Sequence, residues 1–547
     1  MLKKKNNFNL LLSTGIIMSV LVTPNINVDS IILPKFIILV SIAFSTIPLL
    51  SQNLKYLYRI KLGKILLFIL LIILIQLVLA VIFSSSPFEQ QLYGQFGRGL
   101  GFLTEISLIL ILVYSLYYVN LTSNKILFKS LFISGLITCV YSILQKFDLD
   151  IFSWGPRENG IGGLFGNPNF QSAFAAMMII PTIVYARSQK NGLVKVFIYP
   201  LPLLILLYIS SSTQGLILSF FSVCLFILIY TWHKKRLVFY IYLFFFTLFG
   251  FILLLGALGH GPLSEYLYTR SVRARGDIFR TSLIIAKSNP FSGVGLDSLG
   301  DYYLANMDLR TANSVGEFTN SAHNLFLHYA STGGFILALS QYAIVLLVIY
   351  SFMKSQKNFN LENTSVFIAW SCYQIQALIS PPHITLMFWN VIFTSIIINF
   401  YLKSNNFYGK SFLTFEVRKK RQRLILIFFM LGLSITYPLF KVDYWQAQAG
   451  KTGDARLAIR SVTNFPESTG RYNLVIENLL KSGLNEEALY IAKEAVEFNR
   501  LNLNGWLLII SNESASVPDK IMARNQILKL DPNYQVRNEY ILPDFAP

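Results

Sequence analysis

The sequence predicts an all-α membrane protein: a polytopic helical bundle with a long extracytoplasmic loop and a soluble helical domain at the C-terminus. Of the 547 residues, 54% are hydrophobic and only 13% are charged, whereas soluble domains carry about 25% charged residues. Several apolar segments reach the roughly 20 residues that a helix needs to cross a bilayer. Backbone groups in lipid must pair within their own segment, and these segments are too long and too uniformly apolar for barrel strands, so we expect helices.

The net charge of +19 does not indicate a nucleic-acid partner. The basic residues stand in short clusters between apolar segments, as anchoring on the cytoplasmic side of a membrane requires. The three cysteines, Cys139, Cys224 and Cys372, lie inside apolar segments, without a partner at metal or disulfide spacing. We expect them to be buried thiols.

The first apolar segment, about 10–22, follows three lysines. This pattern is also typical of a signal peptide. No small-residue cleavage site follows, and the next apolar segment begins almost at once, so we interpret it as the first membrane span.

Twelve further spans follow in order. They are expected at about 31–50, 65–83, 100–119, 126–144, a sixth that ends at Arg187, a seventh and an eighth separated by 210–215, a ninth at 237–258, a tenth at 325–353, an eleventh and a twelfth separated by 381–383, and a thirteenth at 424–440.

Alternation of about 13 spans from a cytoplasmic N-terminus places every loop rich in Lys and Arg in the cytoplasm. The loops with sparse or balanced charge then lie outside, including the longest one, 259–322. An odd number of spans puts the tail outside as well. The predicted domains are therefore a membrane domain, 1–441, and an extracytoplasmic domain, 442–547.

In the tail, Ala and Leu recur at helical spacing. Residues 479–488 indicate a helix, a turn and a second helix, and residues 527–532 resemble the end of another such unit. This pattern is similar to tetratricopeptide repeats, whose period is about 34 residues. A plain bundle of helical hairpins is the alternative. Either kind of domain is suited to packing or to binding a protein partner, and neither suggests catalysis.

The long outer loop carries the ionisable side chains that the spans lack. Four arginines lie before or within a predicted amphipathic helix that runs to about Lys287. They are Arg270, Arg273, Arg275 and Arg280. Arg273 and Arg280 are two turns apart and can share a helix face. His323 stands where the chain returns to the membrane.

Arginine and histidine suit one kind of outer-face chemistry. An enzyme there has no ATP, so it needs a substrate that arrives activated, such as a lipid-linked diphosphate sugar. Cleavage of the sugar–phosphate bond develops negative charge, which fixed cations stabilise. Arginine stays protonated and binds phosphate through two parallel hydrogen bonds, and histidine is the usual base near neutral pH.

The alternative without a functional role is that the loop arginines are solvated or paired with nearby carboxylates, and that His323 is only an interfacial residue. The carboxylates in question are Asp277, Asp297, Asp301 and Glu317.

Other polar residues are expected on the same outer face. They are Arg98, Arg157, Asn167, Asn169 and His383. Arg98 is the only basic residue in its loop, and the glycines on either side of it permit close approach by a ligand. Asp148-Leu149-Asp150 forms a DxD tripeptide of the kind that can hold a metal, but such tripeptides are frequent by chance. We expect no metal and no cofactor.

Several segments occur in one order along the chain. They are Gly94–Leu100, Phe165–Asn169 with its GNPN turn, Arg273–Gly295 with its P-x-x-G-x-G turn, Ser321–Leu327 with His323-Asn324, the Gly333-Gly334 pair, and Tyr373–Gln376. Together they resemble the O-antigen ligase and polymerase family of bacterial membrane glycosyltransferases, over about residues 94–380. Some members also carry a tetratricopeptide-like tail. Two positions depart from the family: Phe279 stands where Trp is common, and Gln214 stands where an arginine is common.

The resemblance implies metal-independent transfer of a glycan from undecaprenyl diphosphate in the bacterial cytoplasmic membrane. The acceptor hydroxyl would belong to a lipid, a glycan or a protein, so ligase, polymerase and protein-glycosylating activities stay open. By the resemblance, His323 is the candidate base. The candidate diphosphate ligands are Arg98, Arg273, Arg275 and Arg280, and the weaker candidates for substrate contact are Asn324, Asn167, Asn169 and Arg157. The glycine turn at Gly293–Gly295 is expected to serve as a hinge or as a point of close approach.

Two other functions compete with transfer. A transporter or flippase would place ionisable residues at mid-membrane and show repeated halves, whereas these spans hold few charges and no visible repeat. A membrane-anchored scaffold would use the tail to bind a partner, but this leaves the arginine–histidine loop unexplained.

Overall fold

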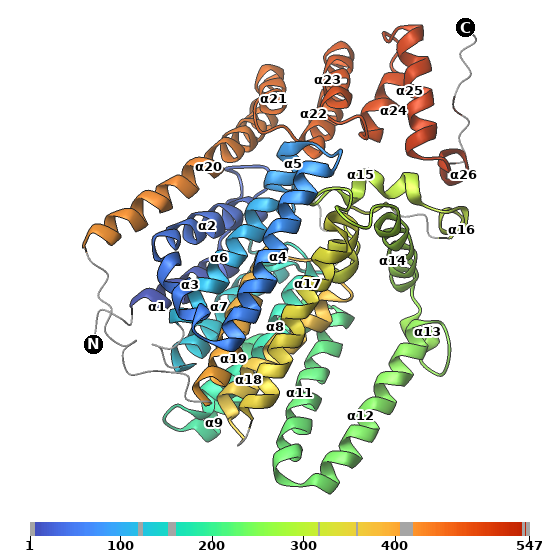
Figure 1. Ribbon diagram of the computed structural model, residues 1–547. Helices are drawn as coiled ribbons and strands as arrows, with labels where there is room; N and C mark the ends of the chain where they lie inside the picture. Colours follow the sequence, from blue (N-terminus) through green and yellow to red (C-terminus); the bar gives the residue numbers. More distant parts are fainter. Residues whose placement is uncertain are drawn as a thin grey trace.

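The computed structural model describes residues 6–118, 124–150, 152, 160–314, 318–356, 359–404, 419–538 and 542. Among these residues every regular element is a helix and none is a strand, as the sequence predicts. Figure 1 shows a bundle of long helices with a separate group of shorter helices, residues 455–538, above it.

Each of the thirteen predicted spans corresponds to a helix or to two consecutive helices. They are α1 (Asn6–Val20), α2 (Ile32–Ser45) with α3 (Leu50–Tyr58), α4 (Lys61–Phe83), α6 (Phe102–Tyr118), α7 (Asn124–Lys146), α8 (Pro168–Arg187), α9 (Gly192–Ile198) with α10 (Leu201–Ser210), α11 (Thr213–Lys234), α12 (Arg236–Ala257), α17 (Leu325–Ser355), α18 (Leu361–Ala377), α19 (Ile384–Ser404) and α20 (Lys419–Thr452).

Within the described residues, ten helices are long and apolar enough to cross a membrane, and two shorter apolar helices span Asn9–Val20 and Phe102–Tyr118. The predicted multi-pass membrane architecture is thus confirmed. Thirteen as the number of spans, and the cytoplasmic side as the side of the N-terminus, stay predictions.

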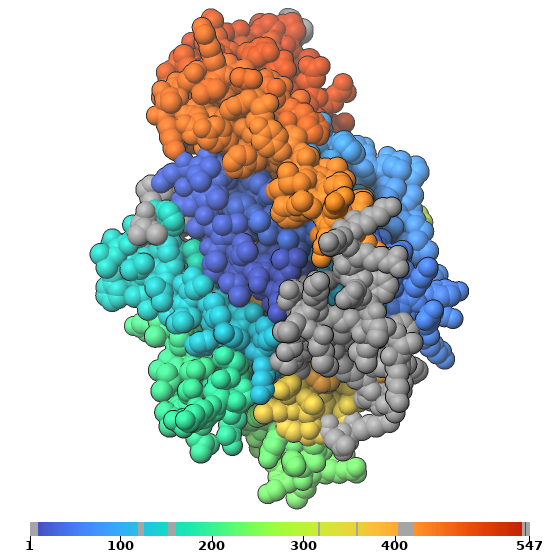
Figure 2. Space-filling model, turned by 90° about the vertical axis from the view of Figure 1, so that its left-hand side faces the viewer, coloured from blue at the N-terminus to red at the C-terminus, as the bar shows by residue number. Residues whose placement is uncertain are grey.

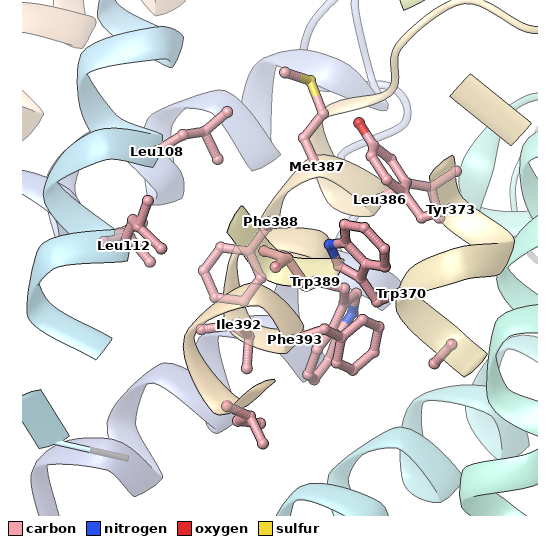
Figure 3. Close-up of a cluster of buried hydrophobic side chains, with 14 of the residues drawn as sticks. Leu108, Leu112, Trp370, Tyr373, Leu386, Met387, Phe388, Trp389, Ile392 and Phe393 are labelled. Carbon is pink, nitrogen blue, oxygen red and sulfur yellow. The ribbon is translucent and has the colours of Figure 1, made fainter. Parts of the chain in front are cut away.

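The centre of the bundle is built on α19. Figure 3 shows Trp389 and Phe393 of this helix close to Trp370 of α18, with Leu108 and Leu112 of α6 on the other side. Each indole N–H has a partner: Trp370 Nε1 donates to Thr394 Oγ1 at 3.1 Å, and Trp389 Nε1 donates to Ser19 Oγ at 3.0 Å. Large buried rings whose polar atoms are hydrogen-bonded form a well-defined core. This core holds the surrounding helices in place.

Helix α12 stands apart from this core in Figure 1, whereas α11 packs on α8 and α18, and α12 leads to α13 (Ser264–Leu267). Much of the apolar surface of α12 is exposed, including Phe244 and Phe251. A helix that is apolar on all sides and largely uncovered by protein is suited to contact with lipid.

The long outer loop folds into short helices around one longer helix. They are α13, α14 (Arg270–Ser288), α15 (Leu299–Tyr303) and α16 (Leu309–Ala312). The predicted amphipathic helix of arginines is α14. It packs against α17, and its buried side chains include Ala274, Ile278 and Ile285.

Residues 289–298, which follow α14 and which we call the strap, are bonded to a break in α17. Gly334 has a φ of 85° and interrupts this helix. Val294 N donates to Ser331 O at 2.9 Å, Gly295 N donates to Thr332 O at 3.1 Å, and Phe335 N donates to Pro290 O at 2.9 Å. Broken helices are tolerated in membranes only where protein satisfies the freed backbone groups, and the strap does this.

Two side chains complete the strap's bonding. Gln76 of α4 donates through Nε2 to Gly333 O at 3.0 Å and also to Phe291 O. Ser86 Oγ donates to Val294 O at 2.7 Å. The glycines are needed for close approach, because a Cβ on Gly293 would lie 2.3 Å from the carbonyl carbon of Thr332. The turn is therefore a point of close approach.

The tail is helical, as predicted, and has its own core. Its helices are α21 (Ala455–Val462), α22 (Thr469–Lys481), α23 (Asn485–Phe498), α24 (Leu503–Ser511), α25 (Val517–Leu530) and α26 (Tyr534–Asn538). Helix α22 packs on α23 and α24 packs on α25, with Tyr472, Ile491 and Trp506 among the buried side chains. This arrangement is compatible with both tetratricopeptide-like repeats and plain helical hairpins.

The tail packs against the outer loops of the membrane domain. It is continuous with α20, whose 34 residues extend about 51 Å, more than the roughly 30 Å of hydrocarbon. Asn499 Nδ2 donates to Asp301 Oδ2 at 3.1 Å, and Thr469 Oγ1 donates to Gln90 Oε1 at 3.3 Å. Gln90 belongs to α5 (Phe88–Tyr93). In Figure 2 the orange tail sits directly on the blue N-terminal helices.

The strap predicts a specific sensitivity at Gly334. A Cβ there would lie 2.2 Å from Phe291 O, in a backbone with a φ of 85°. We expect Gly334→Ala to cost about 1–3 kcal/mol and to lower the apparent Tm of the purified protein, measured at a fixed heating rate. Gly250→Ala in α12 is the control, because a Cβ there meets nothing within 4 Å. Equal Tm values for the two variants would contradict the role of the strap.

Candidate functional site

A cavity of about 360 Å³ lies on the side of the bundle that faces the tail, and we call it the first cavity. It brings together residues that are far apart in the sequence and that the sequence predicts to share one face. Those predicted residues are Arg98, Asn167, Asn169, Arg275, His323 and His383. The other lining residues are Ile32, Phe96, Gly97, Phe170, Asn320, Ser380, Pro381 and Pro382.

The Arg98 loop is held by a buried carboxylate of the strap. Asp297 Oδ2 accepts hydrogen bonds from Gln95 N at 2.7 Å and from Leu100 N at 3.2 Å. Arg98 Nε donates to Asn320 Oδ1 at 2.7 Å. The pKa of Asp297 is raised to about 6, because the effect of burial exceeds the opposite effect of Arg98 and the two backbone N–H groups. The carboxylate therefore both closes the loop and supports the positive charge of Arg98.

Arg275 of α14 brings a second guanidinium to the first cavity. Burial lowers the pKa of Arg275. Its Nε atom is buried and has no hydrogen-bond partner among the described residues. Since buried polar groups are normally bonded, this cation is suited to an anionic ligand.

Arg273 and Arg280 do not line the first cavity. The guanidinium carbon of Arg273 lies 5.8 Å from the centroid of the Tyr268 ring, and Arg280 forms an ion pair with Asp308 at 2.7 Å. Both are exposed. Two residues along a helix turn the side-chain direction by about 200°, so Arg275 faces the cavity where Arg273 faces away. Of the four arginines that are candidates for binding diphosphate, Arg98 and Arg275 line the first cavity.

His323 precedes α17 with a φ of 50°. Burial, together with the positive charges of Arg98 and Arg275, lowers its pKa to about 4. The imidazole is therefore neutral at neutral pH and can accept a proton. Its Nδ1 is buried and without a hydrogen-bond partner among the described residues.

Asn324, a weaker candidate for substrate contact, caps a helix next to His323. Its Oδ1 accepts from Leu327 N at 3.0 Å, which caps the N-terminus of α17, and its Nδ2 donates to Leu378 O at 3.1 Å. The side chain is thus bonded to the protein on both ends and does not line the first cavity. It fixes the start of α17 directly after His323, which is a positioning role.

The GNPN turn starts α8 at the cavity wall. Asn167 caps this helix by accepting from Asn169 N at 2.8 Å, and Asn169 Oδ1 accepts from Ser212 Oγ at 2.7 Å. Both asparagines line the first cavity. The N-terminus of a helix carries partial positive charge and free N–H groups, which favour a bound anion.

Three further residues named from the sequence are Arg157, Asp148 and Asp150. Arg157 is outside the described residues. Asp150 accepts from Tyr141 Oη at 2.7 Å and from Gln145 Nε2 at 2.9 Å, and neither it nor Asp148 lines the first cavity. Among the described residues no group of three or more His, Cys, Asp or Glu side chains is placed to hold a metal ion.

Sequence reasoning missed Asn320 and Ser380. Asn320 orients Arg98, and Ser380 Oγ donates to Gln214 Oε1 at 2.7 Å. Gln214, which stands where an arginine is common in the family, is therefore directly behind the cavity wall. The only available signal was proximity in sequence, since Asn320 and Ser380 stand close to His323 and His383.

The chain is similar to a known protein family. The family model described as O-antigen ligase matches residues 199–341, which include α14, the strap, His323 and the break in α17. The match supports the O-antigen ligase family, which confirms the predicted family, and the tetratricopeptide-like character of the tail stays a prediction. A search of curated proteins found no match.

The division among the arginines can be tested with inorganic pyrophosphate and the purified full-length protein, in buffer containing EDTA. A hydrogen bond to a charged group contributes about 1.5–3 kcal/mol, so Arg98→Gln and Arg275→Gln should each weaken binding about 10-fold or more in calorimetric titration. Arg273→Gln is the matched control from the other face of α14 and should bind like the wild type. A larger loss in Arg273→Gln than in Arg275→Gln would contradict the assignment.

Proposed function

Since this chain is a multi-pass helical membrane protein with an O-antigen ligase domain, we propose that it transfers a glycan from a polyprenyl-diphosphate-linked donor to an acceptor hydroxyl. The reaction takes place at the extracytoplasmic face of the bacterial cytoplasmic membrane. One observation carries the proposal: Arg98, Arg275 and His323 line the same cavity.

The cavity offers a site for the leaving group. In the transfer, the bond between the anomeric carbon and the diphosphate oxygen breaks, and the polyprenyl diphosphate leaves with the bonding electrons. Arg98, Arg275 and the N-terminus of α8 supply positive charge where this negative charge develops. Fixed charges in a partly buried site act more strongly than the same charges in water.

His323 takes the proton of the acceptor hydroxyl as the acceptor oxygen bonds to the anomeric carbon. Without substrate, burial and the two arginines hold its pKa at about 4, which makes it a weak base. A bound diphosphate would offset the two positive charges and move the pKa back toward the ordinary value of about 6.5. The base is therefore strengthened when the donor is in place.

The transport alternative has less support. Ionisable residues inside spans mark transport pathways, and the acidic Glu105 of α6 and the basic Lys35 of α2 are among the buried ones. Glu105 Oε1 accepts from Tyr329 Oη at 3.0 Å, and Lys35 Nζ donates to Leu164 O at 2.6 Å. Each is bonded inside the bundle, which favours a structural role.

The acceptor decides between a ligase and a polymerase. A lipid, a growing glycan or a protein could each present the hydroxyl. The glycan profile of a deletion strain separates these activities: a ligase defect removes all polymer from the acceptor, and a polymerase defect leaves single repeat units on it.

We expect His323→Ala to reduce glycan transfer by about 10²–10⁴-fold, the usual contribution of a general base, with normal amounts of the protein in the membrane. The lipid-linked donor should accumulate, which thin-layer chromatography of extracted lipids would measure. His260→Ala is the control, because His260 is exposed and does not line the first cavity. Transfer at the wild-type rate in His323→Ala would eliminate the histidine as the base.

A further inference from the structure

A second cavity of about 610 Å³ adjoins the first one. The two cavities share Ile32, Gly97, Asn167, Phe170 and His383 as lining residues, so they are contiguous. We propose that the second cavity binds the saccharide chain of a substrate and that the tail domain forms part of this site. This inference rests on the proposed function, because it names where the sugars next to the reacting bond would lie.

The tail supplies one wall of the second cavity. Gln446 and Gly450 line it from the outer end of α20, and Leu474 and Asn478 line it from α22. The opposite wall is the segment between α1 and α2, together with the GNPN turn. The cavity therefore exists only where the membrane domain and the tail meet.

The lining chemistry differs between the two cavities. The first has two arginines and suits an anion, whereas the described residues that line the second include no Lys or Arg and two ionisable side chains, Asp29 and His383. Its polar side chains are mainly amides, which both donate and accept hydrogen bonds. A saccharide presents hydroxyls that do the same, while the described lining residues offer no Lys or Arg to a diphosphate.

Two amides of the tail wall have unused hydrogen-bonding capacity. Asn478 is exposed, and its side chain has no hydrogen-bond partner among the described residues. Gln446 is only 4% exposed, yet its Oε1 also lacks a partner in the described part of the chain. Buried amide oxygens are nearly always bonded, so this wall has the character of a binding surface.

The wall is held in place by the contacts that dock the tail. Asp301 of the outer loop accepts from Gln90 Nε2 at 2.9 Å and from Asn499 Nδ2 at 3.1 Å. Asn533 Nδ2 donates to Met307 O at 2.7 Å. Tail and loop are thus joined at two separate points, which fix the position of the tail wall relative to the rest of the bundle.

Gly450 provides a way to fill the second cavity without strain. It lies within α20, and a Cβ there would meet nothing within 4 Å. Gly450→Phe should therefore fold and place a ring in the space that we assign to the saccharide. Gly250→Phe is the matched control, since Gly250 is also a helical glycine with nothing within 4 Å of a Cβ, and it lines neither cavity.

The test is the initial rate of transfer by the full-length protein in lipid nanodiscs, measured against donor lipid extracted from the host membrane and against its acceptor. We expect Gly450→Phe to raise the KM for one of the two substrates at least 5-fold and Gly250→Phe to change neither. The substrate whose KM rises is the one whose saccharide lies in the second cavity. Unchanged KM values for both substrates would overturn the inference.

Pyrophosphate binding keeps this test separate from the proposed function. If Gly450→Phe binds pyrophosphate like the wild type, the first cavity is intact and the KM result stands. If it does not, Asn478→Ala decides, with an expected KM increase of about 2–10-fold for the loss of a hydrogen bond and wild-type KM values as the contrary result. Failure of the proposed function would show differently, as transfer that His323→Ala does not change.

Discussion

The pairing between the strap and the break in α17 is the interaction on which the site depends. The break at Gly334 frees backbone groups inside a membrane bundle, and the strap and Gln76 bond to them. Because the strap is held there, its Asp297 carboxylate is placed to close the Arg98 loop. The same pairing anchors the first half of α17, directly after His323. One set of backbone bonds thus positions both the cation and the base.

The electrostatics of the first cavity follow from this arrangement. Two half-buried guanidinium groups and a helix N-terminus face one space, while Asp297 supports only one of the arginines. Burial and this excess of positive charge together keep His323 neutral, and the charge makes the cavity complementary to a diphosphate. The tail adds a wall of different chemistry, uncharged and rich in amides. The charged diphosphate of the proposed substrate matches the first cavity, and its neutral saccharide matches the second.

Motifs in the sequence anticipated much of the first cavity. Arg98, the GNPN turn and His323 are separated by long stretches of sequence, yet they line one space, and the arginine helix is α14 as predicted. The choice of arginine could not be predicted, because it depends on which face of α14 packs on α17. The tail wall could not be predicted either, because the hydrogen bonds of Asn499 and Asn533 join segments that lie far apart in the sequence. Apolar segments predicted the helices, but short ones such as Asn9–Val20 leave the span count open.

In the proposed function, a diphosphate and a base meet in the first cavity. The most direct measurement is an electron cryomicroscopy structure of the full-length protein in nanodiscs with a polyprenyl diphosphate bound. We expect the diphosphate between Arg98 and Arg275, with the imidazole of His323 facing the same space. A diphosphate bound on the Arg273 and Arg280 face of α14, away from His323, would contradict it.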